Sequence, residues 1–141
     1  MTFTIDERTT FGKRVARRLQ EERIIWLTTV SQSGEPNPRP VWFLWDGNNF
    51  IIYSRPGTYK LKHIRNNPRV SLSFDGDGMG GDIVIIAGMA HIDQDVQPAD
   101  QVSAYINKYT EGLQRINMTP EVFAQEYSVA LRIEPHRIRG H

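Results

Sequence analysis

The sequence contains no cysteine among its 141 residues. Disulfide bonds, thiol catalysis and cysteine-ligated metal sites are therefore excluded. Long apolar runs are also missing, because no stretch approaches the roughly 20 residues of a membrane-spanning helix. The N-terminal stretch MTFTIDERTT is polar and unlike a signal peptide. These absences predict a cytoplasmic protein that does not insert into a membrane.

Acidic residues are absent from a long central segment. Between Gly47 and Phe74 there is no Asp or Glu, but there are five basic residues, Arg55, Lys60, Lys62, Arg65 and Arg69. Residues 75–100 then hold six aspartates and no Lys or Arg, and the net charge is only +1. A nearly neutral chain argues against a nucleic-acid partner. The basic segment is either an anion site or a solvated surface.

The hydrophobic pattern predicts one domain over residues 1–141, mainly β with peripheral helices. Strands are expected over residues 23–30, 38–47, 50–54, 69–74, 82–93 and 128–135, with Gly88 as a bulge. Helices are expected over residues 7–22, 58–66, 99–114 and 119–127, with Asp6 capping the first. Short links between the strands predict a six-stranded antiparallel barrel.

The segment VWFLW (41–45) is apolar on both faces of its expected strand. One face can line the barrel. The other face needs a cover, and a helix, a second subunit or a flat aromatic ligand would each provide one.

Several motifs are excluded by their context. GDGMGG (76–81) matches the dinucleotide-binding pattern, but a strand follows it where that site needs a helix. The same stretch lacks the glutamate that ends a calcium loop. The four histidines show no metal-ligand spacing, and no Ser/His/Asp pattern occurs. Neither a metalloenzyme nor a hydrolase is indicated.

The expected helix at Thr58 gives the basic segment a physical role. The first N–H groups of a helix lack partners and lie at the positive end of its dipole, so they attract anions. Ser54, Arg55, Thr58 and Lys60 can converge there on a phosphate. The alternative is that Thr58 only caps the helix and the lysines face solvent.

An ordered set of segments carries a family resemblance. WLTTVSQSGEPNPRPVWFLWDGNNFIIYS, NNPRVSLSFDGD and IVIIAGMAHI, with ALRIEPHRIRGH at the end, resemble the pyridoxamine-phosphate-oxidase-like superfamily of split β-barrel flavoproteins. PVWFLWDG and YSRPGTYKLKHIRNNPRVSLSF are most similar to its probable oxidoreductases that depend on the deazaflavin F-420. The resemblance implies a flavin-reductase-like split barrel and a homodimer with its cofactor sites at the subunit interface.

The resemblance also implies the site residues. The cofactor would be F-420 (an 8-hydroxy-5-deazaflavin), or alternatively FMN, and no metal is implied. The ring would lie against Val41, Trp42 and Phe43, and the phosphate end would meet Tyr53, Ser54, Thr58 and Lys60, with Arg55 nearby. Tyr59 stands where the oxidases have an arginine, which weakens the case for FMN. No catalytic side chain is identified, although Tyr53 is a candidate proton donor.

The implied reaction is hydride transfer from reduced F-420 to a small conjugated acceptor such as a quinone, an enone or a tetrapyrrole. Two alternatives remain at this point. One is an FMN-binding oxidase or electron-transfer protein of the same fold. The other is a non-catalytic protein that binds a flavin or haem.

Overall fold

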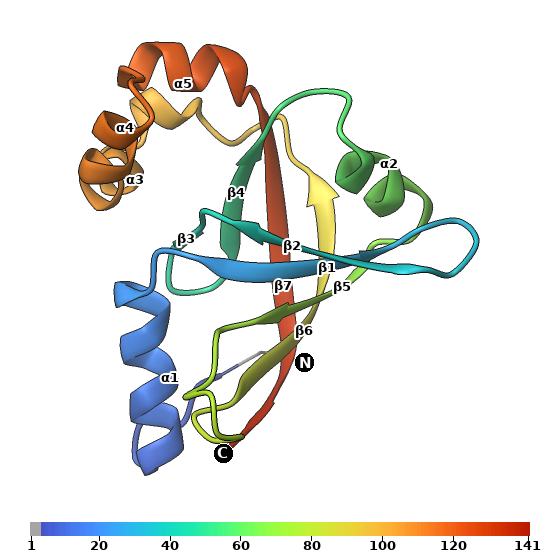
Figure 1. The fold of residues 1–141 in the computed structure, drawn as a ribbon, viewed down its shortest axis with the longest axis vertical. Helices are drawn as coiled ribbons and strands as arrows, with labels where there is room; N and C mark the ends of the chain where they lie inside the picture. The colour runs from blue at the N-terminus through green and yellow to red at the C-terminus, as the bar shows by residue number, and fades with distance from the viewer. Residues whose placement is uncertain (1–3) are drawn as a thin grey trace.

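The computed structural model describes residues 4–141, and within them seven strands form one antiparallel sheet (Figure 1). The strand order is β2-β1-β5-β6-β7-β4-β3. The strands are β1 (Ile25–Val30), β2 (Pro36–Val41), β3 (Leu44–Trp45), β4 (Phe50–Ser54), β5 (Arg69–Ser73), β6 (Val84–Ile92) and β7 (Val129–Gly140). The sheet curls into a half-barrel, as the sequence predicts, with one strand more than the expected six.

The helices lie at the periphery of this sheet (Figure 1). They are α1 (Thr10–Glu21), α2 (Tyr59–Asn66), the 3-10 turn η1 (Ala99–Gln101), α3 (Ser103–Lys108), α4 (Thr110–Arg115) and α5 (Pro120–Glu126). The expected single helix over 99–114 is therefore wrong, because the chain breaks at Val102 and Tyr109. Among the described helices, none has the length and apolarity needed to cross a membrane.

Helix α1 begins later than expected. Thr9, rather than Asp6, is its cap, and the Thr9 hydroxyl accepts a hydrogen bond from the Gly12 N–H at 2.9 Å. Asp6 instead binds the guanidinium of Arg8. Val15 and Leu19 are fully buried against the sheet, as their four-residue spacing predicts.

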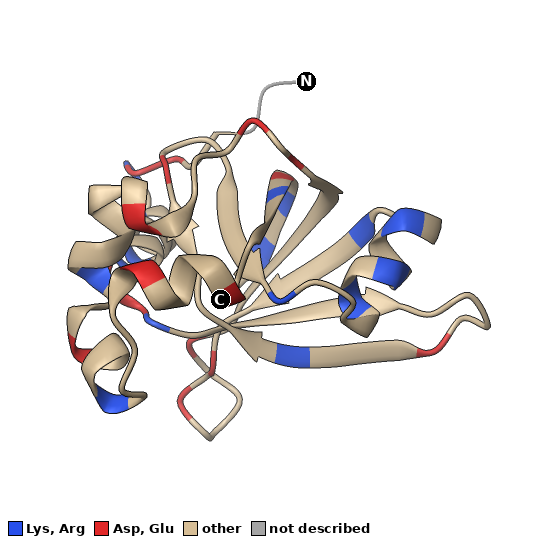
Figure 2. Cartoon of the chain, turned by 90° about the horizontal axis from the view of Figure 1, so that it is seen from above, with Lys and Arg blue, Asp and Glu red and all other residues tan. Residues whose placement is uncertain are grey.

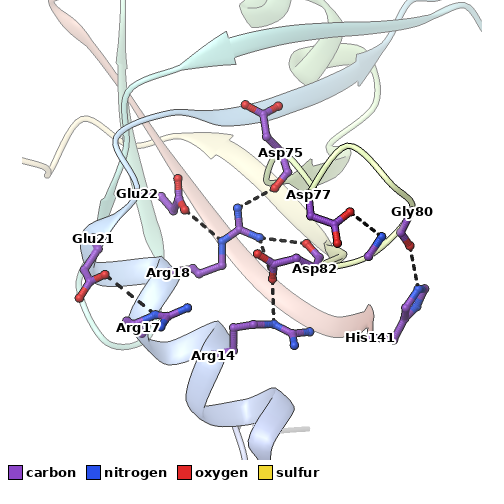
Figure 3. A network of polar contacts seen from close by, with 11 residues as sticks. Arg14, Arg17, Arg18, Glu21, Glu22, Asp75, Asp77, Gly80, Asp82 and His141 are labelled. Atoms are coloured by element: carbon purple, nitrogen blue, oxygen red, sulfur yellow. Dashed lines mark hydrogen bonds and ion pairs between the residues drawn. The ribbon is translucent and has the colours of Figure 1, made fainter.

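A buried arginine joins α1 to the glycine-rich loop between β5 and β6 (Figure 3). Arg18 donates to the carbonyl oxygens of Asp75 at 2.7 Å and Asp82 at 3.0 Å, and it forms an ion pair with Glu22. Arg14 lies 2.9 Å from the Asp82 carboxylate. Strand β6 follows the loop, so the expected exclusion of a dinucleotide fingerprint holds.

The expected strand over 38–47 is interrupted at Trp42 and Phe43. The Tyr109 hydroxyl accepts a hydrogen bond from the Phe43 N–H at 2.8 Å. The Phe43 carbonyl accepts from the Lys108 ammonium at 2.8 Å. Side chains therefore satisfy the backbone of Phe43 in place of a neighbouring strand, which splits the segment into β2 and β3 and adds the seventh strand.

The second apolar face of this segment is covered by helices of the same chain. Trp42 stacks on Tyr109 with ring centroids 4.4 Å apart, and on Phe123 at 5.5 Å. The helix alternative is thus confirmed. The argument that this face requires a second subunit or a flat ligand does not hold.

The C-terminal half confirms two local predictions and corrects another. The ladder between β6 and β7 shifts register at Ala87/Gly88, where a bulge is expected. Thr119 caps α5, and Pro120 is its first residue. Strand β7 runs five residues past the expected Pro135, so His136 lies in the sheet.

Candidate functional site

The turn between β4 and α2 leads into a helix whose start no side chain caps. Pro56 and Gly57 occupy it, and the φ of +77° at Gly57 suits the central glycine of a type II turn. Thr58 makes no capping hydrogen bond to α2. Its hydroxyl instead pairs with that of buried Ser54 at 3.1 Å. Without this side-chain cap, the first turn of α2 can offer backbone donors to an anion.

A groove of about 750 Å³ runs between this helix start and the edge strand β2. It is lined by polar, basic and small residues: Thr29, Ser31, Ser33, Glu35, Asn37, Arg39, Pro40, Val41, Gly57, Thr58, Tyr59, Lys60 and His63. Basic residues gather along α2 in Figure 2. The groove therefore combines positive charge, hydroxyl groups and a helix N-terminus.

Two cations line the groove, the half-buried Lys60 and the exposed Arg39. Burial lowers the pKa of the half-buried Lys60 ammonium, and the charge of nearby Arg39 lowers it further. Within residues 4–141, neither side chain makes an ion pair or a hydrogen bond. Two neighbouring cations without a carboxylate partner favour a bound anion, because it would relieve their repulsion.

His63 and Tyr59 extend the groove along α2. The His63 Nδ1 lies 2.9 Å from the Thr29 hydroxyl, and the Tyr59 ring packs near the His63 ring. Tyr59 is nevertheless 79% exposed. Lys62 points to solvent and is not among the groove residues.

A second cavity of about 310 Å³ adjoins the groove and shares Pro40, Val41 and Lys60 with it. Its other residues are mainly aromatic and come from the start of β1, the break after β2, strand β4 and the C-terminal helical region: Ile24, Trp42, Tyr53, Tyr105, Ile116, Phe123 and Tyr127. The buried Tyr105 hydroxyl has no hydrogen-bond partner in the described chain. We call this space the aromatic cavity.

The structure brings together only part of the predicted site. Val41, Thr58 and Lys60 line the groove, while Trp42 and Tyr53 line the aromatic cavity. Ser54 lies behind Thr58 and contacts it. Phe43 is fully buried between Phe50 and Phe74, so its ring faces the barrel core instead of either space.

Two predicted residues are already engaged. Arg55 lies 3.4 Å from Glu126, and its guanidinium stacks 4.9 Å from the centre of the Tyr127 ring. Tyr53 donates to the Gln97 carbonyl at 2.7 Å. Burial, followed by the charge of Asp100, raises the pKa of Tyr53 to about 12. Tyr53 is therefore a poor proton donor here.

Sequence reasoning missed Arg39, Tyr105, Phe123 and Tyr127. Arg39 could have been suspected from PNPRPV, where alternating prolines indicate an edge strand that leaves its other residues free. Tyr105 and Phe123 read as core residues, since nothing local shows that their helices close over Trp42. No group of three or more His, Asp or Glu side chains in the described chain could hold a metal ion.

These residues fit a phosphate-bearing molecule with a flat ring system. The uncompensated cations and the open helix start suit the phosphate, and the end of β2 at Val41 leads from the groove toward aromatic walls. The groove residues offer cations, hydroxyl groups and backbone N–H groups, all of which can bind a phosphate. Glu35 is the one carboxylate among them.

Comparison with known proteins agrees with this reading of the fold. The chain is 30% identical over 130 residues to general stress protein 26 of Bacillus subtilis, covering 90% of this chain and 85% of that protein. A solved F-420 reductase superposes with a TM-score of 0.65 at 20% identity, covering 87% of this chain and 94% of the other. The haem storage protein of Vibrio cholerae gives 0.65 at 13% identity, covering 94% and 95%. The two superpositions, at 20% and 13% identity, show a shared fold.

The family match is more direct. The sequence model described as pyridoxamine 5'-phosphate oxidase matches residues 11–141. That range includes the groove, the aromatic cavity and all seven strands. The chain therefore belongs to the pyridoxamine 5'-phosphate oxidase family.

Proposed function

We propose that the protein is an oxidoreductase that holds F-420 by its phosphate end and passes hydride from the reduced cofactor to a small conjugated acceptor. The observation that carries the proposal is the pair Lys60 and Arg39, two neighbouring cations in a groove with no carboxylate bound to either. A phosphate placed between them would be held by charge-assisted hydrogen bonds.

In this proposal, each residue around that phosphate has a role. Lys60 and Arg39 supply charge, and the Thr58 hydroxyl and the first N–H groups of α2 supply hydrogen bonds. Ser54 orients Thr58 through their 3.1 Å contact. Val41, at the end of β2, borders both spaces and would lie against the edge of the ring system.

The bound cofactor would supply the hydride, so the protein needs no strong acid or base of its own. Its side chains position the ring and exclude water. Tyr53 is tied to Gln97 and holds its proton tightly, so we assign the proton of the reduction to solvent.

An FMN-dependent oxidase or electron-transfer protein is the second candidate. The family description, which names an oxidase, supports it. Tyr59 weighs against it, because this exposed ring supplies no charge to the phosphate. Haem binding is supported only by the fold likeness to a haem storage protein, and no histidine lines the aromatic cavity.

The homodimer remains part of the proposal and rests on the family resemblance. Ile85 and Met89 support it, since both project from the outer face of β6 and are 42% and 37% exposed. Sedimentation at micromolar concentration tests it, and a monomer would contradict it.

Parallel fluorescence titrations of the cofactor-free protein with F-420 and FMN test the cofactor assignment. We expect saturable binding of F-420 and weaker binding of FMN. The reverse order would select the FMN candidate. If neither bound, the proposed function would be wrong.

A further inference from the structure

We propose that Lys108 is a carbamate site, where the free amine takes up carbon dioxide and the resulting anion balances the charge of Arg23. Lys108 lines neither the groove nor the aromatic cavity, so the inference does not depend on the proposed function. It gives the C-terminal helical region a reversible covalent modification.

Lys108 is the last residue of α3 and lines a pocket of about 580 Å³. Leu19 and Trp45 give this pocket apolar surface, and Glu21 and Arg23 add one charge of each sign. Among the described lining residues, Lys108 is the only one that carries an amine. The pocket leaves ample room for a three-atom molecule such as carbon dioxide.

The Lys108 ammonium is held against Phe43 without a carboxylate partner. Its Nζ donates to the Phe43 carbonyl at 2.8 Å and lies 3.6 Å from the centre of the Phe43 ring. Within residues 4–141, Lys108 forms no ion pair. Partial desolvation beside another cation is the setting that makes a lysine nucleophilic.

The neutral form of this amine is well populated near neutral pH. Burial lowers the pKa of Lys108 to about 8, the charge of Arg23 lowers it further, and Glu22 opposes the shift. At pH 8 about half of the Lys108 side chains therefore carry a lone pair on nitrogen, against roughly 0.4% for an ordinary lysine.

Carbamate formation needs no oxidant or reductant. The lone pair on Nζ forms a bond to the carbon of carbon dioxide, an electron pair of one C=O bond moves to its oxygen, and one proton passes from nitrogen to solvent. The carbamate nitrogen keeps one N–H, so it can still donate to the Phe43 carbonyl. A neutral imine formed with an aldehyde has no N–H and would lose that bond, which favours carbon dioxide as the electrophile.

The neighbouring charges suit an anionic product. The cation of Arg23, which repels the ammonium, would attract the carbamate, and its present partner is the exposed Glu111 at 3.7 Å. Glu21 and Glu22 are the two carboxylates on this side. Each is already paired with an arginine of α1, at 4.0 Å and 3.1 Å respectively, which weakens their repulsion of an anion.

NMR of the full chain in isotope-labelled bicarbonate at pH 8 tests the proposal. Trapping with a trialkyloxonium reagent, followed by peptide mapping, converts the carbamate into a stable ester and locates it. Lys108→Arg keeps a cation that can donate to Phe43 but forms no carbamate. Lys62→Arg is the matched control, because it removes an exposed lysine.

The wild type should show a carbamate signal whose trapped ester maps to Lys108. Lys108→Arg should lose this signal, and Lys62→Arg should keep it. The α-amino group also reacts, since its ordinary pKa is near 8, and its signal serves as an internal reference in every variant. A trapped ester at the α-amino group alone would overturn the proposal. Trapping reads the wild type directly, so this outcome does not depend on how a variant folds.

Two further readouts test the environment of the amine. Arg23→Gln should lower the carbamate fraction, because it raises the pKa of Lys108 and removes the attraction on the product; an unchanged fraction would contradict the pairing that the proposal requires. At fixed pH and ionic strength, bicarbonate should raise the unfolding temperature of the wild type more than that of Lys108→Arg, because carbon dioxide binds the folded amine in preference to the protonated lysine of the unfolded chain. Equal shifts in the two proteins would also overturn the proposal.

Discussion

Replacing Lys60 should have opposite effects on cofactor binding and on the stability of the free protein. Lys60→Met removes the ammonium but keeps a long apolar stem of similar length. A charge-assisted phosphate contact contributes roughly 1.5–3 kcal/mol. The dissociation constant for F-420 should therefore rise about tenfold to a hundredfold.

The free protein should not lose stability in the same variant. The pKa of Lys60 is lowered by burial and by Arg39, which means that the fold disfavours the charged ammonium. Removing that charge relieves the repulsion, so thermal unfolding of Lys60→Met at pH 7 should occur at the wild-type temperature or above it. If Lys60 stabilised the fold through its charge, Lys60→Met would instead unfold at a lower temperature than the wild type.

The matched control is Lys62→Met, two residues along the same helix. Lys62 is exposed and lies outside the groove, yet its removal changes the net charge equally. We expect its affinity for F-420 to stay within about twofold of wild type, since surface charges contribute little at physiological salt. Equal losses in both variants would show that only general charge attraction operates. An unchanged dissociation constant in Lys60→Met would show that the basic segment is only a solvated surface.

The pH dependence of binding provides a third measurement on the same residue. The phosphate of F-420 is a diester, which carries one negative charge and has no proton to lose near neutral pH. Any change in its affinity at higher pH must therefore come from the protein. As the pH rises through the lowered pKa of Lys60, the ammonium loses its proton and the affinity for phosphate should fall. The affinity of Lys60→Met should vary less over the same range.

Three further outcomes are expected. Arg39→Ala should weaken F-420 binding and raise the pKa of the Lys60 ammonium, which NMR titration of the lysine side chains would detect; an unchanged pKa would contradict the facing arrangement. Tyr109→Phe should lower the free energy of unfolding by about 1–3 kcal/mol in urea, because it leaves the buried Phe43 N–H without its acceptor; a wild-type value would show that the strand break needs no anchor. Stability should rise between pH 8 and 10, because burial lowers the pKa of Lys108 to about 8 and the unfolded chain then binds more protons. It should fall above pH 10, where Tyr53 keeps its proton in the fold but loses it on unfolding; a flat urea-unfolding profile over this range would refute both assignments.

Local sequence signals predicted the turn and the helix that border the groove. The turn Pro56-Gly57, the helix start at Thr58 and the helix end before Pro68 are all encoded within a few residues, and the structure has α2 at Tyr59–Asn66. The position of Lys60 in the first turn of α2 follows directly from that helix start. Local rules could not show that the Thr58 hydroxyl would pair with Ser54 rather than cap α2, since both choices satisfy it.

The remainder of the site depends on contacts between distant residues. Tyr109 lies 66 positions after Phe43, and its hydroxyl determines where the expected strand 38–47 breaks. The aromatic walls come from helices whose apolar stripes predict burial but not the partner they cover. Arg39 faces Lys60 only because β2 pairs with β1 at the sheet edge, beside α2. Strand periodicity alone carries none of this information.

The groove and the aromatic cavity are built from largely different parts of the chain. Val41 borders the groove, while Trp42 packs on Tyr109 and Phe123 of the C-terminal helical region. The proposed phosphate contacts come from β2 and α2, whereas Tyr105 and Phe123 come from segments that contribute nothing to the groove. Substitutions in α3–α5 can therefore reshape the aromatic cavity and leave the phosphate contacts intact. Among the described residues, only Pro40, Val41 and Lys60 border both spaces, so substitutions elsewhere in the aromatic cavity should leave the affinity of the groove for phosphate unchanged.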